Sequence, residues 1–287
     1  MTDPEKSGTF PITDNHFHID LKRGRGLDAV NDFRRAGGTH VFLVSLPSWT
    51  LGYSVRKPED YIPVFEETIR TAGTICRETD VTAFPVLGIH PVEIMHLSEE
   101  FGISRAYEIM AGGFDIAASY ILEKKAVGIK SGRPHFQVSP EIFEASCRVM
   151  SHAFETARDI GCPVQLHVED MTPESVENIT QIAKAARISP GKVMNHHAAP
   201  LVSVCEKHGI WPSVTTGKDL TAQALSQGTR FLMETDYCDD PSNPGFVLGP
   251  KTVPKRTKQL LPEWGEEVFR KIHQENPAKI YDVEIEL

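Results

Sequence analysis

Several histidines and acidic residues in this sequence stand in short groups, and each group directly follows a run of apolar residues. His16-Phe17-His18 ends one run, His167 ends another, Asn195-His196-His197 ends a third, and Glu234-Thr235-Asp236 ends the last. Imidazoles and carboxylates that converge on one point bind divalent cations such as Zn²⁺, Mn²⁺, Fe²⁺ or Co²⁺. Such a cation makes a bound water acidic enough to be a nucleophile near neutral pH. The residue types therefore indicate metal-assisted hydrolysis.

These groups can meet only if the strands that carry them belong to one sheet. From the start of the first expected strand to the start of the last, the mean step is (230 − 12)/7, or about 31 residues. A strand, a crossover helix and two loops need about 30 residues or more. The expected strands are 12–17, 40–46, 82–89, 125–130, 163–168, 192–196, 210–214 and 230–235.

The segments between the expected strands are typical of amphipathic helices. Residues 28–36 end at Gly37 and residues 140–160 end at Gly161, and glycine at such a position favours the left-handed turn that closes a helix. Residues 173–188 begin with a proline, which the first turn of a helix tolerates. We expect residues 262–274 to form a closing helix.

Eight strands that alternate with helices indicate an α/β protein with a parallel sheet, and this number of units predicts a (β/α)8 TIM barrel. An open doubly wound sheet is the competing architecture, but no G-x-G-x-x-G follows the first expected strand. Because no linker or low-complexity break interrupts the pattern, we expect one domain over residues 1–287. Within it, residues 1–10 are an N-terminal extension and residues 262–287 are the closing helix and tail.

The overall composition excludes several classes of protein. With 30 basic and 39 acidic side chains the net charge is −9, which argues against non-specific wrapping of duplex DNA. The polar start lacks the apolar segment of a secretory signal, and no apolar run is long enough to cross a bilayer, so we expect no membrane association. Five scattered cysteines without a C-x-x-C pair predict neither disulfides nor a thiolate zinc site, which favours a cytoplasmic location.

In a TIM barrel the active site lies at the carboxyl ends of the strands. His16 and His18 are two residues apart on a strand and therefore point the same way. Polar groups with possible chemistry also end the expected strands at His90 and Lys130, so that six of eight strand ends carry one. A structural role is the commoner explanation for any single group, but the set as a whole favours a shared site.

The segments TDNHFHID, GIHP, QLHVE, VMNHH and RFLMETD, in this order and spacing, resemble the TatD family of metal-dependent hydrolases, which belongs to the amidohydrolase-like barrels. The resemblance extends from about residue 12 to the closing helix, and SGRPHF and DDPSNPGFVLGPKTVPKR are similar to a less-studied branch of the family. TatD proteins are metal-dependent deoxyribonucleases that trim single-stranded DNA. The resemblance places His90 on the substrate side and implies metal ligands at His16, His18, His167, His196 and Asp236.

Lys130 departs from the family pattern, because TatD sequences usually place a metal-bridging glutamate there. One explanation is that CO₂ carboxylates the Lys130 amine and gives an anionic carbamate that bridges two cations, as in barrel hydrolases that resemble phosphotriesterase and dihydroorotase. A second is that Lys130 stays an ammonium, contacts a substrate phosphate and leaves room for one metal. A third is that the strand is misregistered and Lys130 lies outside the barrel. Glu169 and Asp170 are weaker candidates for the missing carboxylate.

The other histidines receive no functional role from the sequence. His135 lies in a loop, and His152, His208 and His273 fall in expected helices or at their ends. His196 and His197 are neighbours, and successive strand residues face opposite sides, so at most one of them binds a metal. The resemblance to the family favours His196.

The basic residues of the expected loops could hold an anionic substrate, and aromatic residues in the same loops could stack on bases. Arg133 is the basic residue closest in sequence to Lys130. The loop aromatic residues are Trp49, Tyr53, Phe136 and Tyr237. The basic residues are Lys22, Arg23, Arg25, Arg56, Lys57, Arg133, Lys218, Lys251, Lys255, Arg256 and Lys258.

The leading hypothesis is hydrolysis of a nucleic-acid phosphodiester by a metal-activated hydroxide. Asp236 takes the proton of the attacking water, Arg133 stabilises the developing charge, and His90 faces the substrate. One or two divalent cations (Zn, Mn, Fe, Co or Mg) are the expected cofactors. The alternatives are a small-molecule amidohydrolase or lactonase with a carboxylated lysine, acting on a small phosphorylated or carbonyl substrate, and a non-catalytic metal-binding barrel.

Overall fold

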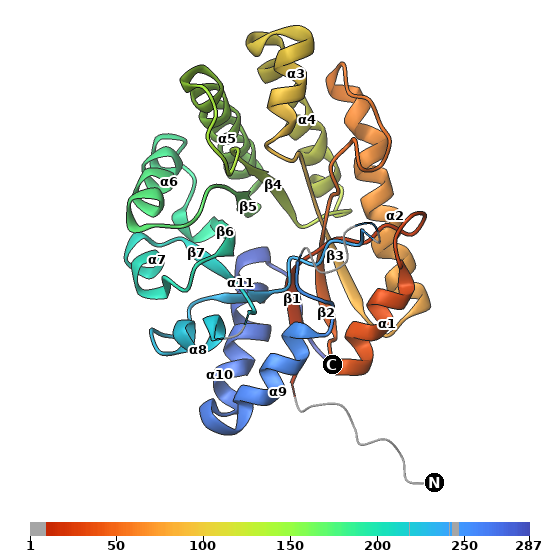
Figure 1. Ribbon diagram of the computed structural model, residues 1–287, viewed down its shortest axis with the longest axis vertical. Coiled ribbons are helices and arrows are strands. Elements are labelled where there is room, and N and C mark those ends of the chain that lie inside the picture. The colour runs from red at the N-terminus through yellow and green to blue at the C-terminus, as the bar shows by residue number, and fades with distance from the viewer. Residues whose placement is uncertain (1–9, 218, 241, 243–246) are drawn as a thin grey trace.

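Eight parallel strands form one sheet in the computed structural model, and their order in space follows their order in the sequence (Figure 1). The structure describes residues 10–217, 219–240, 242 and 247–287. Nearly all of the expected N-terminal extension lies outside this range, as do Lys218 and part of the stretch DDPSNPG. The strands are β1 Thr13–Phe17, β2 His40–Val44, β3 Thr82–Gly88, β4 Gly128–Gly132, β5 Val164–His167, β6 Val193–Ala198, β7 Trp211–Thr215 and β8 Leu232–Glu234.

The sheet curls until β1 meets the chain that leaves β8, so the barrel is nearly closed. Phe17 and Tyr237 form a parallel bridge, and the His18 backbone N–H donates to the Tyr237 carbonyl at 2.8 Å. The buried Asp14 carboxylate accepts hydrogen bonds from the Thr235 backbone N–H at 3.1 Å and from its hydroxyl at 2.7 Å. Side chains as well as backbone therefore join the two ends of the sheet at this seam.

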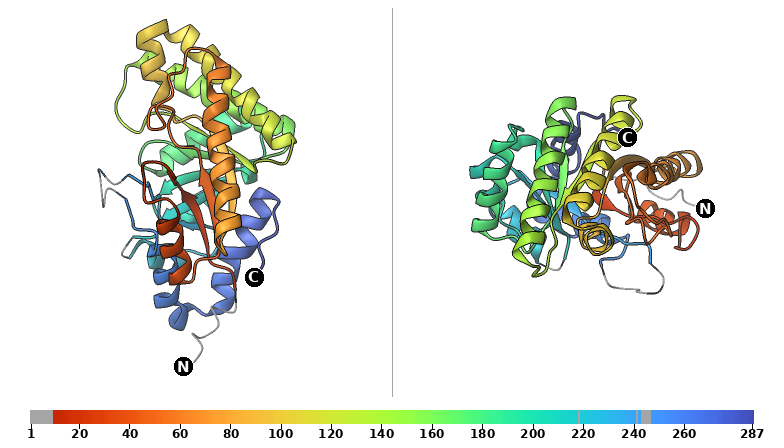
Figure 2. Two further views of the ribbon diagram at one scale, coloured as in Figure 1. Left: turned by 90° about the vertical axis from the view of Figure 1, so that its right-hand side faces the viewer. Right: turned by 90° about the horizontal axis from the view of Figure 1, so that it is seen from above.

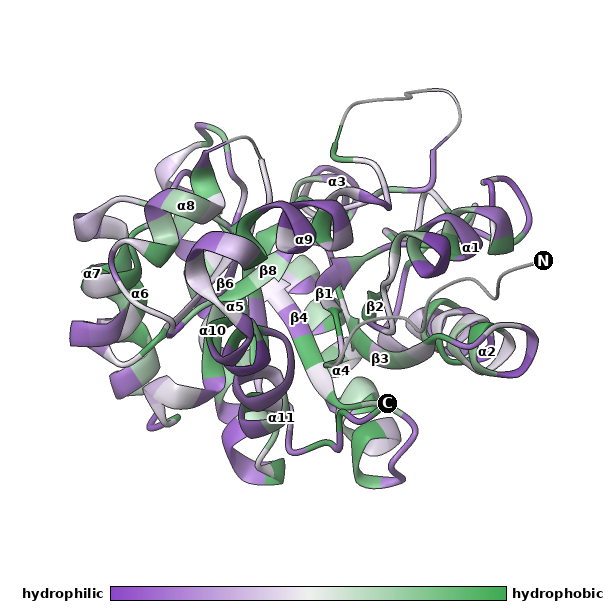
Figure 3. Cartoon of the chain, turned by 90° about the horizontal axis from the view of Figure 1, so that it is seen from below, coloured by the Kyte–Doolittle hydropathy of each residue, from purple (hydrophilic) through white to green (hydrophobic). Residues whose placement is uncertain are grey.

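Helices cover the outside of the sheet on all sides (Figures 1 and 2). Purple and green segments alternate along them in Figure 3, as expected for helices with one face against a sheet. None of the described helices is long and apolar enough to cross a membrane. The helices are α1 Leu27–Ala36, α2 Ile62–Glu78, α3 Glu93–Phe101, α4 Ile103–Leu122, α5 Pro140–Ile160, α6 Pro173–Ala185, α7 Val202–His208, α8 Leu220–Leu225, α9 Thr252–Trp264, α10 Glu266–Arg270 and α11 Asn276–Tyr281.

The predicted TIM-barrel class is confirmed, and all eight expected strands are present. The fourth strand begins at Gly128 rather than at residue 125 and continues to Gly132. The closing helix predicted over 262–274 is helical from residue 266 on, where α10, a π-helical segment Lys271–Glu275 and α11 follow one another, but its predicted start at 262 is wrong, because α9 ends at Trp264. Gly265 then adopts φ 83°, a left-handed conformation that a helix cannot contain, and α10 begins after it.

The C-terminal helix α11 fills the end of the barrel opposite to the carboxyl ends of the strands. Tyr281, its last residue, is 4% exposed and stacks on Phe42 of β2 with ring centroids 3.8 Å apart. Its hydroxyl donates to Asn15 Oδ1 at 3.1 Å and also contacts the Gln165 amide. At this end of the barrel, Tyr281 therefore packs its ring against the apolar Phe42 and directs its hydroxyl to polar groups of β1 and β5, the strands that also carry candidate site residues.

His273 is fully buried next to β1, away from the candidate site, and makes the fold sensitive to acid. Its Nδ1 accepts a hydrogen bond from the Thr13 backbone N–H at 3.2 Å, and its Nε2 lies 2.7 Å from the Thr257 hydroxyl. Burial lowers the pKa of His273 from 6.5 to about 4. As the pH falls below 6.5, the unfolded chain takes up the proton first, so the folded state loses stability until the pH reaches about 4.

We therefore expect His273→Gln to reduce the pH dependence of the free energy of unfolding by about 1.4 kcal/mol per pH unit between about pH 6 and pH 4. Denaturant unfolding of wild type and variant at several pH values measures this slope. His96→Gln, at an exposed position on α3, is the matched control. Parallel pH profiles for wild type and His273→Gln would contradict the assignment.

Candidate metal centre

Two imidazoles from the end of β1 present bare nitrogens to the same point. His16 Nε2 and His18 Nε2 lie 3.1 Å apart. The other nitrogen of each ring donates a hydrogen bond, His16 Nδ1 to Gln165 Oε1 at 2.6 Å and His18 Nδ1 to the Val44 carbonyl at 2.9 Å. Since a neutral imidazole carries one N–H, these bonds leave both Nε2 atoms with a free lone pair.

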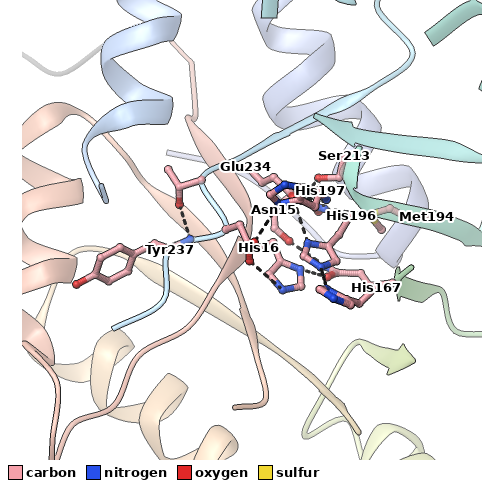
Figure 4. Close-up of polar contacts among 12 residues, drawn as sticks. Asn15, His16, His167, Met194, His196, His197, Ser213, Glu234 and Tyr237 are labelled. Atoms are coloured by element: carbon pink, nitrogen blue, oxygen red, sulfur yellow. Dashed lines mark hydrogen bonds and ion pairs between the residues drawn. The ribbon is translucent and has the colours of Figure 1, made fainter. Parts of the chain in front are cut away.

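A second pair of imidazoles, from β5 and β6, stands against the first (Figure 4). His167 Nδ1 and His196 Nε2 lie 2.8 Å apart, and His196 Nδ1 lies 3.2 Å from a Glu234 carboxylate oxygen. The ring of His196 stacks on that of His16, with centroids 3.8 Å apart and planes at 12°. Four predicted ligands from three strands therefore form one cluster.

The cluster fits divalent cations. Nitrogen ligands at about 2.0–2.1 Å from a tetrahedral zinc ion lie roughly 3.3 Å from each other, close to the spacing of both imidazole pairs. Burial lowers the pKa of His16, His167 and His196 well below 6.5 and that of His18 to about 4, so the rings are neutral, as metal ligands must be. Two groups of residues could each hold a cation, because within each group the possible ligand atoms lie within 4.8 Å of one another. One group is His16, His18 and Asp236, and the other is His16, His196 and Glu234.

Asp236 brings a carboxylate to the β1 pair, as the sequence predicts. Its Oδ1 lies 3.8 Å from His16 Nε2, and its Oδ2 accepts a hydrogen bond from His197 Nδ1 at 3.1 Å. Both Asp236 and His197 have φ 53°, a left-handed conformation that side chains rarely adopt and that is concentrated at functional sites. This backbone turns His197 out of the strand pattern, so its side chain is 57% exposed and holds Asp236 instead of joining the cluster.

Lys130 lies inside the barrel, which excludes the interpretation that its strand is misregistered. The residue is 3% exposed, and its Nζ lies 3.2 Å from His16 Nε2. Burial lowers the pKa of Lys130 to about 8, while the nearby Asp236 and Glu234 carboxylates act in the opposite direction. The amine therefore lies next to the first imidazole pair, at the sequence position where TatD proteins usually have a glutamate.

Glu234 supports the cluster through hydrogen bonds, a role that the sequence did not assign to it. This fully buried carboxylate accepts hydrogen bonds from the His197 backbone N–H at 2.6 Å and from the Ser213 hydroxyl, and it faces His196 Nδ1 (Figure 4). Burial raises the pKa of Glu234, and the hydrogen bonds oppose this shift. Because its oxygens are already engaged, Glu234 orients His196, and the set with His18 and Asp236 is the more open one for a cation.

Gln165 of β5 fixes His16 in the orientation that a metal ligand needs. Its Oε1 accepts from His16 Nδ1, and its amide nitrogen donates to the Asn15 carbonyl at 2.9 Å and contacts the Tyr281 hydroxyl. The last residue of α11 is thus linked through one amide to a predicted ligand on β1. Gln165 was not among the candidates from sequence, since a glutamine within an apolar strand carries no metal-binding signal by itself.

We expect Gln165→Leu to weaken metal binding by about 10- to 100-fold, because partners that orient a ligand have effects of this size. Titration of metal-free protein with Zn²⁺ or Co²⁺ measures the affinity. Gln181→Leu, at an exposed position of α6, is the matched control. Unchanged affinity in a folded Gln165→Leu protein would contradict this role.

His90 and His135 stand on either side of His167. The His90 ring lies 4.8 Å from that of His167, and its Nδ1 accepts a hydrogen bond from the Val92 backbone N–H at 3.3 Å. His135 Nδ1 lies 2.8 Å from His167 Nε2. The sequence assigned no function to His135, although its position in the loop after β4, on the face of the strand ends, could have suggested one.

Arg133 contacts other groups than the sequence predicts. Within the described chain, its guanidinium pairs with the Glu169 carboxylate, donates to Asn178 Oδ1 at 2.7 Å and to Cys147 at 3.5 Å, and lies over the Phe143 ring. The residue is 1% exposed. With its donors engaged in this way, Arg133 supports the loop after β4, and its predicted contact with the substrate would require these bonds to break.

Most basic loop residues also have acidic partners. Ion pairs join Lys22 to Glu67, Arg25 and Lys251 to Asp32, and Arg56 to Glu100, at distances of 2.8 to 3.5 Å. Among the loop aromatic residues, Tyr237 is buried and donates to Asp239, whereas Trp49 and Phe136 are 42% and 44% exposed. The aromatic residues are therefore better placed than the basic ones to contact a substrate.

The chain is similar to known proteins in sequence and in structure. A family model described as TatD related DNase matches residues 13–282. An uncharacterized protein of Methanocaldococcus jannaschii is 34% identical over 284 residues, which cover 97% of this chain and 98% of that protein. A TatD homologue from Escherichia coli has a similar structure, with a TM-score of 0.65 at 16% identity, covering 95% of this chain and 98% of that chain. A mutant of a phosphotriesterase-like lactonase from Deinococcus radiodurans gives a TM-score of 0.59 at 16% identity, covering 96% and 97%. The two structural similarities show the shared barrel fold.

Proposed function

Since the chain belongs to the TatD-related DNase family of metal-dependent hydrolases, we propose that it hydrolyses phosphodiester bonds in single-stranded nucleic acid with one or two bound divalent cations. The observation that carries this proposal is the convergence of two imidazole pairs and the Asp236 carboxylate at one end of the barrel. Each of His16, His18 and His196 has its second nitrogen hydrogen-bonded away from the cluster. Such an arrangement suits cation binding better than a structural hydrogen-bond network.

The cluster offers two cation positions. His16, His18 and Asp236 would hold one cation. His167 and His196, whose nitrogens lie 2.8 Å apart, would hold the other, as the family resemblance implies. Lys130 Nζ lies 3.2 Å from His16 Nε2. Divalent cations bound there would lower the pKa of water and polarise a phosphoryl oxygen. The cytoplasmic location and the identity of the cation, among Zn, Mn, Fe, Co and Mg, remain part of this proposal.

The protein's own groups then handle the proton and the substrate. Asp236, held by His197 and 16% exposed, accepts the proton of the attacking water. His90 is neutral, because burial lowers its pKa to about 3. Its Nδ1 accepts from Val92, so its proton is on Nε2, which can donate to a phosphoryl oxygen on the substrate side.

We propose further that Lys130 carries a carbamate. The ammonium first loses one proton to the solvent. The neutral Nζ then attacks the carbon of CO₂, so that an N–C bond forms while one C=O π bond opens and its electron pair goes to oxygen. A second proton leaves the nitrogen, and the product is an anionic carbamate with two oxygens. The position supports this step, since a cation between the imidazole pairs would repel an ammonium that is 3.2 Å from His16 Nε2. The alternative keeps Lys130 protonated, with one cation and with a substrate phosphate as its partner.

The same centre could act on a carbonyl instead of a phosphoryl group, and a carboxylated lysine in place of the family's glutamate favours this second candidate. The two functions differ in substrate alone. An assay of metal-reconstituted protein against labelled single-stranded oligonucleotides and against a panel of lactones and amides separates them.

We expect reconstituted protein to shorten the oligonucleotides and a chelator to stop the reaction. Label at the 3′ or 5′ end reports the polarity of cleavage. Hydrolysis of lactones or amides without hydrolysis of oligonucleotides would overturn the proposed substrate. Protein that binds no divalent cation would overturn the centre itself.

A further inference from the structure

An open pocket of about 430 Å³ lies beside the metal centre, between the loop after β2 and the helix α3. Ser48, Trp49 and Tyr53 line it from the loop, and Glu93 and His96 line it from α3. Two of the loop aromatic residues that the sequence indicates as possible stacking partners are therefore in one pocket. Neither the metal ligands nor the proposed proton transfers use these side chains.

A chain of edge-to-face and tilted ring contacts connects this pocket to the centre. The Trp49 ring lies 5.6 Å from that of His90, with the planes at 84°, and His90 lies 4.8 Å from the ligand His167. On its other side the Trp49 ring lies 5.2 Å from His96. His90 and His96 thus pack against the Trp49 indole, which is 42% exposed. One of these two imidazoles, His90, is the group that we propose donates to the phosphoryl oxygen.

Glu93 gives the pocket a buried acceptor. The residue is 4% exposed, and its Oε1 accepts a hydrogen bond from the Ser48 hydroxyl at 2.6 Å. Its Oε2 is buried and has no hydrogen-bond partner among the described residues. Burial raises the pKa of Glu93 to about 7, so the group is an anion only above neutral pH. A buried carboxylate oxygen without a donor is then costly, and a ligand that supplies an N–H there gains a strong hydrogen bond.

We propose that this pocket is a nucleobase subsite, in which a base with an exocyclic amine stacks near Trp49 and donates that amine to Glu93. The proposal rests on the proposed function and names the part of the substrate that lies beside the scissile bond. It predicts that the protein prefers cytosine or adenine over uracil or thymine at this position, because the latter two present a carbonyl oxygen where the amine would be.

The charges of the pocket favour a neutral ring over a phosphate or a metal cation. Glu93 and Glu100 would repel a phosphate, and the one guanidinium at the pocket, that of Arg56, already pairs with Glu100 at 2.8 Å. A metal cation is disfavoured too, because the groups of described residues able to hold one lie in the centre and not here. A planar group with one N–H donor could both pack against the Trp49 indole and donate a hydrogen bond to Glu93 Oε2.

Binding of deoxycytidine and deoxyuridine monophosphates to the metal-reconstituted protein tests the subsite. The two bases differ at the exocyclic amine and the adjacent ring proton, so the nucleotides are a matched pair. By titration calorimetry at about pH 8.5, where Glu93 is ionised, we expect wild type to bind the cytidine nucleotide about tenfold more tightly. Glu93→Gln keeps the shape but presents an amide N–H, and we expect it to abolish or invert this ratio. Trp49→Ala should weaken both nucleotides by about tenfold.

Glu99→Gln, at an exposed position on the same helix, is the control and should keep the wild-type ratio. Thermal unfolding shows whether each variant is folded. Equal binding of the two nucleotides by wild type, or an unchanged ratio in folded Glu93→Gln, would overturn the subsite. Oligonucleotide hydrolysis without base discrimination would reject the subsite alone. Base discrimination in binding, without hydrolysis of any oligonucleotide, would reject the proposed function and leave the subsite standing.

Discussion

Replacing Asp236 with asparagine is expected to lower kcat/KM for oligonucleotide hydrolysis by about a thousandfold or more. An amide cannot take up the proton of the attacking water, and it is a weaker ligand for a divalent cation than a carboxylate. The substitution keeps the size of the side chain, and asparagine tolerates the left-handed conformation that Asp236 adopts with φ 53°. The fold should therefore persist, which circular dichroism and thermal unfolding verify.

Measuring the metal content of Asp236→Asn together with its kinetics distinguishes loss of proton transfer from loss of a metal ligand. A variant that retains its cations and loses activity has lost proton transfer, whereas one that loses a cation has lost a ligand. Asp28→Asn, in the exposed first turn of α1, is the matched control and should be fully active. Activity within tenfold of wild type in Asp236→Asn would be incompatible with both proposed roles.

Lys130→Ala is expected to remove one bound cation and to lower activity by about a hundredfold or more, because the carbamate would be the anionic bridge between the two imidazole pairs. Lys130→Glu supplies a carboxylate without CO₂, as TatD sequences usually do, and should recover much of the metal content. Comparison of Lys130→Ala with Lys130→Glu therefore separates loss of the anionic group from its replacement by a carboxylate.

Two measurements at neutral pH test the carbamate. Native mass spectrometry should show the added mass of one CO₂ on wild type and none on either Lys130 variant. Removal of bicarbonate during reconstitution should lower the metal content of wild type but not that of the two Lys130 variants. Lys125→Ala, exposed just before β4, is the control. Metal content that is independent of bicarbonate and unaltered in Lys130→Ala would rule out the carbamate.

The sequence was most informative where one regular spacing decided the outcome. The step of about 31 residues between apolar runs predicted the barrel, since few other folds repeat a parallel strand and a helix at that interval. The two-residue spacing of His16 and His18 predicted that both face the same way, and their Nε2 atoms do meet. Strand ends in a barrel share one rim, so the approximate place of each ligand followed from the fold.

The sequence was least informative where a side chain finds its partner through the fold. Arg133 pairs with Glu169, 36 residues away, and with Asn178, 45 residues away, and no local pattern marks either partner. His135 reaches His167 from an irregular loop, whose path no periodicity specifies. For such contacts, composition gives the type of group available but not the direction in which it points.

The seam between β1 and β8 also determines when the centre can exist during synthesis. His16 and His18 are synthesised before Asp236, which lies beside His16 in the folded protein but 220 residues later in the chain, the difference between 236 and 16. A nascent chain that has not yet reached its eighth strand therefore holds an incomplete set of ligands. The candidate centre would therefore be complete only after the eighth strand has been made, and fragments that end before it would lack Asp236.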